Sequence, residues 1–234
     1  MLVRIIACLL LFCLSCSAVF AKDKEIPVWL LVQKHYSTGR ISAAIGADIV
    51  RVNLPVATVI CDIKNQRITL YSFKTMRYVV GPLPQMIGEL ATLKPINREL
   101  FAPWQKTNKT ATIMGHTAIL MERKQLRPAT PRPKHIVVTE YLSVCSDIKF
   151  KPDTVRFMSA LSTVDCTQGL PLELSRRSYS PKRPGLDKVP FEILSTLDLR
   201  RGTVPAKDFS LPPGFSKTNT IESMLFADYS GAGE

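Results

Sequence analysis

The chain has 234 residues, with 31 Lys or Arg against 19 Asp or Glu, so its formal net charge is +12 at neutral pH. This length fits one domain of ordinary size with a sizeable core. The basic balance invites nucleic-acid binding, but the sequence has neither a zinc-finger spacing nor an aromatic and basic RRM signature, so nucleic acid is excluded as the expected partner.

The first 21 residues have the three parts of a cleavable export signal. Arg4 supplies a cation, an apolar run follows from Ile5 to Cys16, and the small Val19 and Ala21 precede the charged Lys22. The run is about 12 residues, which is too short to cross roughly 30 Å of hydrocarbon at 1.5 Å per residue. We therefore predict a signal peptide over residues 1–21, a periplasmic mature chain and no transmembrane span; an uncleaved anchor is the alternative.

The same segment offers a second alternative, lipid anchoring at Cys16. Leu14 and Ser15 precede that cysteine, but Cys13 stands where a leucine is usual, so the sequence favours cleavage. Loss of Arg4 with the signal leaves 30 basic against 19 acidic residues, or about +11. In the envelope the abundant polyanions are lipid head groups and lipopolysaccharide, so an anionic envelope surface is one expected partner, with solubility alone as the other reading.

Alternation of apolar and polar side chains is the main fold signal after residue 40 and is typical of half-buried strands. Antiparallel strands joined by short polar turns are predicted over residues 41–45, 50–54, 56–63, 67–73 and 76–80. Further strands are predicted over residues 110–114, 116–123, 135–144, 170–175 and 191–199. The fold class expected from them is mainly β with short helices.

Three segments break the alternation. Prolines at 84, 95 and 103 divide one region into short pieces, predicted as helices over Met86–Leu93 and Ile96–Phe101. A third helix is predicted over Asp153–Leu161, which begins with a capping Asp and has apolar residues at helical spacing. We expect one domain over residues 22–218, an exposed Pro-rich loop at 126–134 and a C-terminal tail at 219–234.

Three of the six cysteines, at positions 8, 13 and 16, would leave with the signal. Cys145 and Cys166 are a candidate disulfide, because an oxidising compartment would allow them to pair across a 20-residue connection. Closing that loop would stabilise the fold by roughly 3 kcal/mol. Two free thiols are the alternative. Cys61 lies in an apolar run and is expected to be buried and inert.

The order of several segments along the chain carries a family resemblance. These segments are Asp48–Val52, the hairpin Ile60–Tyr71, Met76–Tyr78, the strand Ala111–Ala118 and the closing stretch Lys207–Phe215. Together they resemble the envelope half-barrels of the lipoprotein carrier LolA superfamily, in particular an uncharacterised periplasmic branch. The likeness spans most of residues 40–216. His116 departs from the tyrosine that is commoner at its position.

The resemblance implies a strongly curved antiparallel sheet, a half-barrel, wrapped around short helices with an apolar cavity that holds acyl chains. Segments 83–101 and 153–161 would cover the concave face of that sheet. A lipid or lipoprotein ligand is therefore one expectation. The other is a filled core, in which the interior is occupied by Phe157, Met158, Trp104 and Phe101.

Catalytic motifs are missing from the sequence. The mature chain has three histidines, His35, His116 and His135, and no G-x-S-x-G nucleophile elbow. Asp147 and Asp153 adjoin a turn and a helix start, where capping is the common role. No metal-ligand spacing or phosphate loop is present, so no cofactor is expected. The sequence thus favours a non-catalytic binding protein, with an envelope scaffold or accessory subunit as the alternative.

Overall fold

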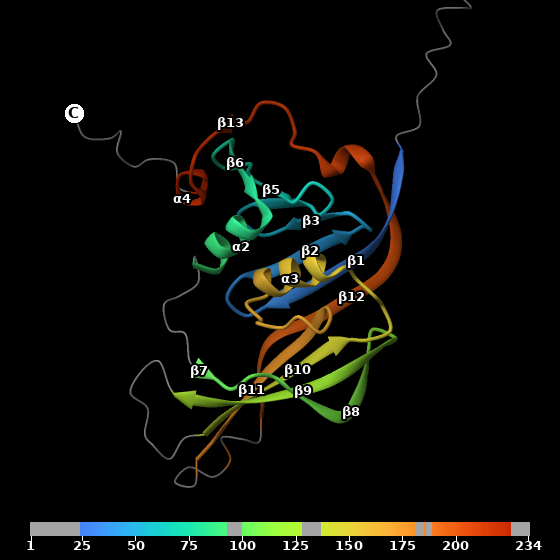
Figure 1. The fold of residues 1–234 in the computed structure, drawn as a ribbon, viewed down its shortest axis with the longest axis vertical. Coiled ribbons are helices and arrows are strands. Elements are labelled where there is room, and N and C mark those ends of the chain that lie inside the picture. Colours follow the sequence, from blue (N-terminus) through green and yellow to red (C-terminus); the bar gives the residue numbers. More distant parts are fainter. Residues whose placement is uncertain (1–23, 93–99, 128–136, 181–184, 186–188, 226–234) are drawn as a thin grey trace, which may run out of the picture.

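The computed structural model describes residues 24–92, 100–127, 137–180, 185 and 189–225 (Figure 1). The predicted signal at 1–21, His135 and most of the predicted loop at 126–134 lie outside these ranges. Within them the protein is mainly β, as predicted, with few short helices and one large sheet. No described helix has the length and apolar character that crossing a bilayer would require.

Thirteen strands form the sheet, in the order β13-β6-β5-β4-β3-β2-β1-β12-β11-β10-β9-β7, with β8 also paired to β9. Their bounds are β1 Glu25–His35, β2 Gly39–Ile45, β3 Ile49–Asn53, β4 Thr58–Asp62, β5 Arg67–Ser72, β6 Arg77–Pro82, β7 Leu100–Phe101, β8 Gln105–Ile113, β9 His116–Arg127, β10 Val137–Cys145, β11 Pro171–Tyr179, β12 Phe191–Pro205 and β13 Ser216–Lys217. All pairs are antiparallel except β13 with β6.

Strand β1 lies near the middle of the sheet, between β2 and β12, although the sequence reasoning assigned no strand to it. Its apolar residues do not alternate because both faces are covered. Leu31 belongs to the main core on one face, while Val28 packs with Ala44 and Phe209 on the other. A strand covered on both faces has a nearly continuous apolar sequence, and that pattern hides its period of two.

The predicted meander is confirmed from β2 to β6. Ile45 pairs with Val50 across the β2–β3 turn, and Asp62 pairs with Arg67 across the β4–β5 turn. The β8–β9 hairpin turns through Met114 and Gly115, both at positive φ (50° and 80°), as a tight two-residue connection requires.

The helices are α2 (Leu83–Thr92), α3 (Pro152–Leu161) and α4 (Ile221–Leu225). Two of the three predicted helices are confirmed as α2 and α3, and both lie on one face of the sheet (Figure 1). The third is corrected in part, since its last residues, 100–101, form β7. Asp153 is not the cap of α3: the N-cap is Lys151, which makes no side-chain cap, and Pro152 occupies the first turn, where its missing N–H costs nothing.

The main core lies between the sheet and the helices. Phe157 and Met158 of α3 are 0% and 1% exposed and share one apolar cluster with Val59, Leu70 and Leu83. Of the two readings of the interior, the filled core therefore describes the space under α3. Trp104 and Phe101 lie elsewhere, over the β9–β11 part of the sheet, and are only partly buried.

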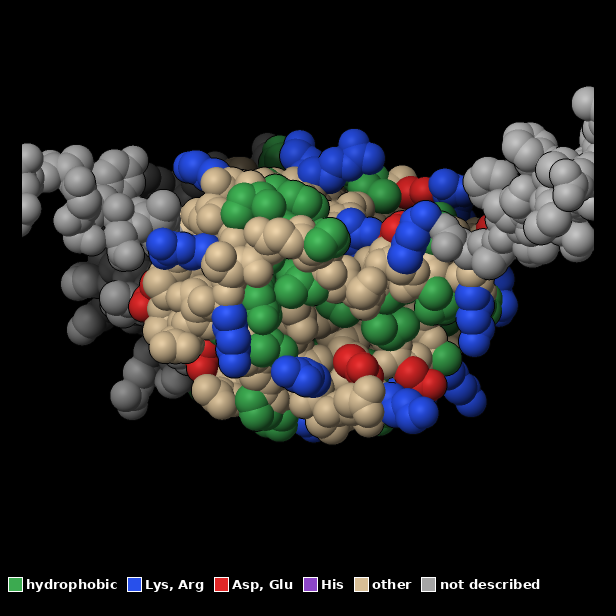
Figure 2. All heavy atoms as spheres, turned by 90° about the horizontal axis from the view of Figure 1, so that it is seen from above, with side chains coloured by type: hydrophobic (Ala, Val, Ile, Leu, Met, Phe, Trp, Pro, Cys, Tyr) green, Lys and Arg blue, Asp and Glu red, His purple; other side chains and the backbone are tan. Residues whose placement is uncertain are grey.

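The described fold continues past Thr218 into the segment predicted as a tail. Helix α4 buries Ile221 and Met224, which are 4% and 0% exposed, in the same cluster as α3. Figure 2 shows the molecule from the end at the top of Figure 1. On this face Lys and Arg side chains lie around groups of hydrophobic side chains.

Candidate functional site

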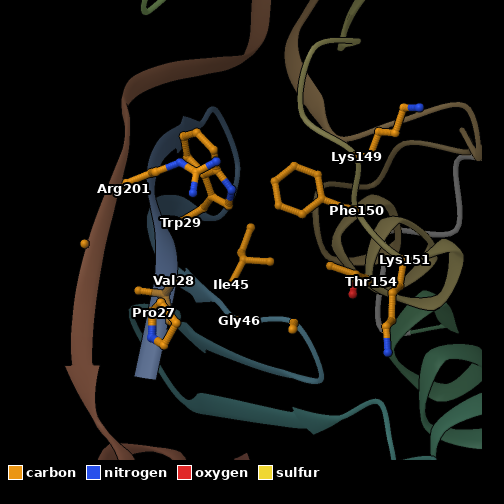
Figure 3. Close-up of a pocket in the computed structure, with 12 residues that line it drawn as sticks. Pro27, Val28, Trp29, Ile45, Gly46, Lys149, Phe150, Lys151, Thr154 and Arg201 are labelled. Carbon is orange, nitrogen blue, oxygen red and sulfur yellow. The ribbon is translucent and has the colours of Figure 1, made fainter. Parts of the chain in front are cut away.

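A pocket of about 350 Å³ opens between the β1, β2 and β12 strands and the segment that leads into α3 (Figure 3). This volume is at the low end of the range of roughly 300–1,000 Å³ typical of small-ligand sites. The sequence reasoning did not place a pocket here, because it did not recognise β1 as a strand.

The wall of the pocket is apolar. Pro27 and Trp29 come from β1, Ile45 from the end of β2, and Phe150 from the segment before α3. Figure 3 shows the Phe150 ring facing Trp29 and Ile45 across the space. Backbone polar groups of the strands are used in the sheet, so the surface offered to a ligand is mostly hydrocarbon.

Three basic side chains lie around the apolar wall of the pocket. Lys149, Lys151 and Arg201 all line the pocket and are exposed. The Arg201 guanidinium lies 4.8 Å from the centroid of the Trp29 ring, and Lys151 forms an ion pair with Asp48. Arg200, next to Arg201 in the chain, does not line the pocket and binds Asp198 at 2.9 Å.

Gly202 permits the close approach of β12 to β1 beside the pocket. A Cβ added there would lie 2.7 Å from Cδ1 of Leu30. A larger residue at this position would require the Leu30 side chain to shift.

His116 lies next to the pocket, in a chain of hydrogen bonds. Its ring packs edge-on against Trp29, with centroids 5.3 Å apart, and its Nδ1 is 3.1 Å from Oδ2 of Asp147. The Cys145 thiol donates to the other oxygen, Oδ1, at 3.2 Å. A histidine, a carboxylate and a thiol are therefore brought together, which the sequence reasoning did not foresee.

The order of these groups is unlike that of a nucleophile and its base, because the carboxylate separates the thiol from the imidazole. Burial, followed by the Asp147 carboxylate, raises the pKa of Cys145 to about 11, so the thiolate needed for attack is scarce at neutral pH. Burial also acts to raise the pKa of Asp147, but hydrogen bonds from Cys145, His116 and the Thr117 backbone outweigh it and hold that pKa below its ordinary value.

His35 lies on the same strand as Trp29 but is 2% exposed. Its Nε2 is 3.3 Å from the Thr163 hydroxyl and its Nδ1 is 3.1 Å from the Ser37 hydroxyl. These contacts fix the β1–β2 turn to the loop after α3. Among the described side chains, no group of three His, Cys, Asp or Glu converges as a metal site would need.

The candidate disulfide between Cys145 and Cys166 is not formed in this structure, where both thiols are free and buried. The two residues belong to different clusters: Cys145 packs in the main core, and Cys166 packs with Met121, its sulfur 4.0 Å from that thioether. Cys61 is buried as expected, and burial followed by the nearby Asp153 raises its pKa to about 12.

A second polar group lies over β9–β11. Glu140, 2% exposed, binds Arg123 at 2.7 Å and Arg176 at 2.7 Å. The Arg123 guanidinium also lies 4.2 Å from the Trp104 ring and 4.6 Å from the Phe101 ring. The carboxylate on β10 thus joins β9 and β11 through their arginines.

Comparison of the chain with protein-family models and with curated proteins finds no match. The resemblance to LolA-like half-barrels therefore rests on the quoted segments alone.

Proposed function

We propose that this chain is an exported, non-catalytic binding protein of the cell envelope that holds the apolar end of an anionic amphiphile, such as a lipid or a lipoprotein acyl chain, in the pocket beside Trp29. The observation that supports it best is the combination of an apolar wall with cations around it. Burial of hydrocarbon supplies affinity, and Lys149 and Arg201 attract the acidic head group.

The half-barrel is part of the same proposal. A sheet that curves around α2 and α3 would bring β1 and β12 toward the segment before α3, and the pocket lies between those elements. Because Phe157 and Met158 fill the space under α3, the ligand is confined to the pocket at the side of the core. In this proposal the ligand therefore binds in the pocket beside Trp29, and not in a cavity under the helices.

Titration of the protein with lysophosphatidylglycerol, followed by Trp29 emission in a Trp104→Phe background, tests the proposal. We expect a saturable change in emission. Ala47→Phe, which places a ring in the pocket from an exposed lining residue, should abolish it, whereas Val189→Phe at an 80% exposed position outside the pocket lining should not. A titration curve that Ala47→Phe leaves unchanged would remove the pocket from consideration.

Charge provides a second comparison. Arg201→Gln together with Lys149→Gln should weaken binding by about tenfold, since an exposed ionic contact contributes up to about 1 kcal/mol. Lys34→Gln together with Lys64→Gln, at two exposed cations that do not line the pocket, is the matched control. Equal losses in the two variants would show that net charge, and not this site, attracts the ligand.

A second candidate function is an envelope accessory subunit with a solid core, and the filled space under α3 favours it. Native mass spectrometry of protein purified gently from an envelope fraction separates the two. Bound lipid of defined mass supports the first proposal. A lipid-free protein that crosslinks reproducibly to one partner in cells supports the second.

A further inference from the structure

Three aromatic rings form a projecting tip at the end of the sheet where the β5–β6 turn meets the loop before β13. Tyr71, Phe73 and Phe215 pack edge to face, with centroids 5.4, 5.1 and 5.3 Å apart. Tyr71 is 1% exposed and anchors the group, while Phe73 is 61% exposed. The tip therefore presents a large apolar ring to the surroundings from a buried base.

The backbone holds this tip in place. Met76, 43% exposed, has φ of 53°, a conformation that disfavours a side chain of its size and that turns it to the corner of the hairpin. The amide of Ser216 donates to the Met76 carbonyl at 2.9 Å. On the other side, the Thr75 hydroxyl donates to the carbonyl of Met224 in α4 at 2.6 Å. The turn is thus braced by both later segments.

The charged residues within the segments of the tip are basic, whereas α4, which braces the turn, carries the exposed Glu222. Lys74 and Lys217 are exposed, and neither residues 73–76 nor residues 209–217 include an Asp or a Glu. Figure 2 shows Lys and Arg side chains around hydrophobic ones on this end of the molecule. An exposed apolar group with flanking cations complements a surface whose outer layer is negatively charged and whose inner layer is hydrocarbon.

We propose that this tip is a docking surface for an anionic lipid bilayer. Phe73 and Met76 enter the boundary between head groups and acyl chains, and Lys74 and Lys217 contact lipid phosphates. Phe73 and Met76, 61% and 43% exposed beside the exposed Lys74, suit a bilayer, because a membrane interface accepts single protruding apolar side chains with cations next to them. This surface is separate from the pocket beside Trp29 and goes beyond the proposed function.

Sedimentation of the full mature chain with vesicles of equal parts phosphatidylglycerol and phosphatidylethanolamine tests the proposal, with phosphatidylcholine vesicles as the neutral comparison. We expect binding to the anionic vesicles that weakens with added salt. Phe73→Ser with Met76→Ser should lower partitioning by at least about tenfold. Lys74→Glu with Lys217→Glu should lower it by at least about tenfold and remove the preference for anionic vesicles.

Matched controls use exposed residues outside the tip: Phe191→Ser with Val189→Ser, at 53% and 80% exposure, and Lys34→Glu with Lys64→Glu. Both should bind as the unmodified protein does, and the unfolding midpoint of every variant checks its fold. The proposal is overturned if the unmodified protein fails to sediment with anionic vesicles at low salt, or if the tip variants sediment as well as it does. Binding lost in Ala47→Phe but kept in the tip variants would assign the contact to the pocket mouth and overturn it too.

Discussion

The two ends of the sheet bury different kinds of side chain. We name the part from β2 to β6, with α2, α3 and α4 over it, the covered half, and the part from β9 to β11 the arginine half. The covered half has a dry interior of aliphatic side chains around Phe157. The arginine half places the Arg123, Glu140 and Arg176 group on the equivalent face, beside the aromatic rings of Trp104 and Phe101.

The difference teaches that alternation along a strand predicts which side chains point inward but not what they meet there. Buried hydrocarbon in the covered half is stabilising at every position. In the arginine half each inward charge depends on its partner, because an unpaired buried charge is costly. Within the described chain, the Trp104 indole Nε1 and the Gln125 amide Nε2 of the arginine half are buried without a hydrogen-bond partner, against Arg51 Nε of β3 in the covered half. The arginine half is therefore the more fragile of the two.

The largest expected effect is that of Glu140→Ala. It removes the buried carboxylate that binds both Arg123 and Arg176 and should lower the free energy of unfolding by about 3–5 kcal/mol, measured by urea denaturation. The matched variant replaces all three residues, as Arg123→Met, Glu140→Leu and Arg176→Met, and should be near neutral or stabilising. If Glu140→Ala lowers the free energy of unfolding by less than about 1 kcal/mol, the arginine half is no more sensitive to substitution than the covered half.

In the covered half, the strongest comparison is Met224→Ala in α4. Met224 is 0% exposed, so its truncation should cost about 2–5 kcal/mol in the same denaturation experiment. The exposed neighbour Glu222 is the control, and Glu222→Ala should change stability by less than about 0.5 kcal/mol. If neither change alters the free energy of unfolding, α4 is not part of the covered half, and the domain ends near Thr218 as the sequence predicted.

The two halves also show how much of the fold could be predicted from the sequence. Most of the β2–β6 meander and helices α2 and α3 were predicted from their periodicity, while β4, whose two faces are both buried, was predicted from its β-branched residues and the polar turn after it. Strand β1 was missed because both its faces are covered. Glu140 follows the inward parity of Val138 and Leu142, so its burial was visible in the pattern, but its partners on β9 and β11 depend on strand register.

The candidate site was missed for a related reason. Trp29 and Phe150 are more than a hundred residues apart in the chain, and they meet only because β1 lies at the centre of the sheet. The same applies to Asp147, predicted as a turn residue, whose contact with His116 is made by the pairing of β9 and β10. No local pattern contains either contact. The α4 helix, in turn, is a short segment whose two buried residues are too few to show a period.

The cysteines give a chemical comparison of the two halves, with an effect on rates and not on stability. Burial raises the pKa of Cys61 in the covered half to about 12 and that of Cys145, at the border, to about 11. Burial also raises the pKa of Cys166, while the charge of Arg123 opposes it. We therefore expect iodoacetamide to modify native protein slowly at pH 8, and Cys61 to react last as the pH rises.

Mass mapping of alkylated peptides measures that order, with protein unfolded in guanidinium as the control in which all three thiols react alike. Recovery of Cys145 and Cys166 as a disulfide from the envelope-purified chain would contradict the arrangement of two separate thiols. Early reaction of Cys61 would show that the covered half opens more readily than the arginine half.

The smallest expected effect concerns Asp147, at the border of the two halves. Its pKa in the folded protein lies below the ordinary value of 3.8, since hydrogen bonds from Cys145, His116 and Thr117 outweigh the opposing effect of burial. A carboxyl group with a depressed pKa stabilises the fold above its unfolded pKa, and this contribution is lost as the pH falls through the folded value. Asp147→Asn should therefore be slightly less stable than the unmodified protein at pH 6 and equal to it at the acid end of the range. A difference that persists unchanged into acid would show that Asp147 is held by packing, and would leave the arginine half alone as the region where buried charge governs stability.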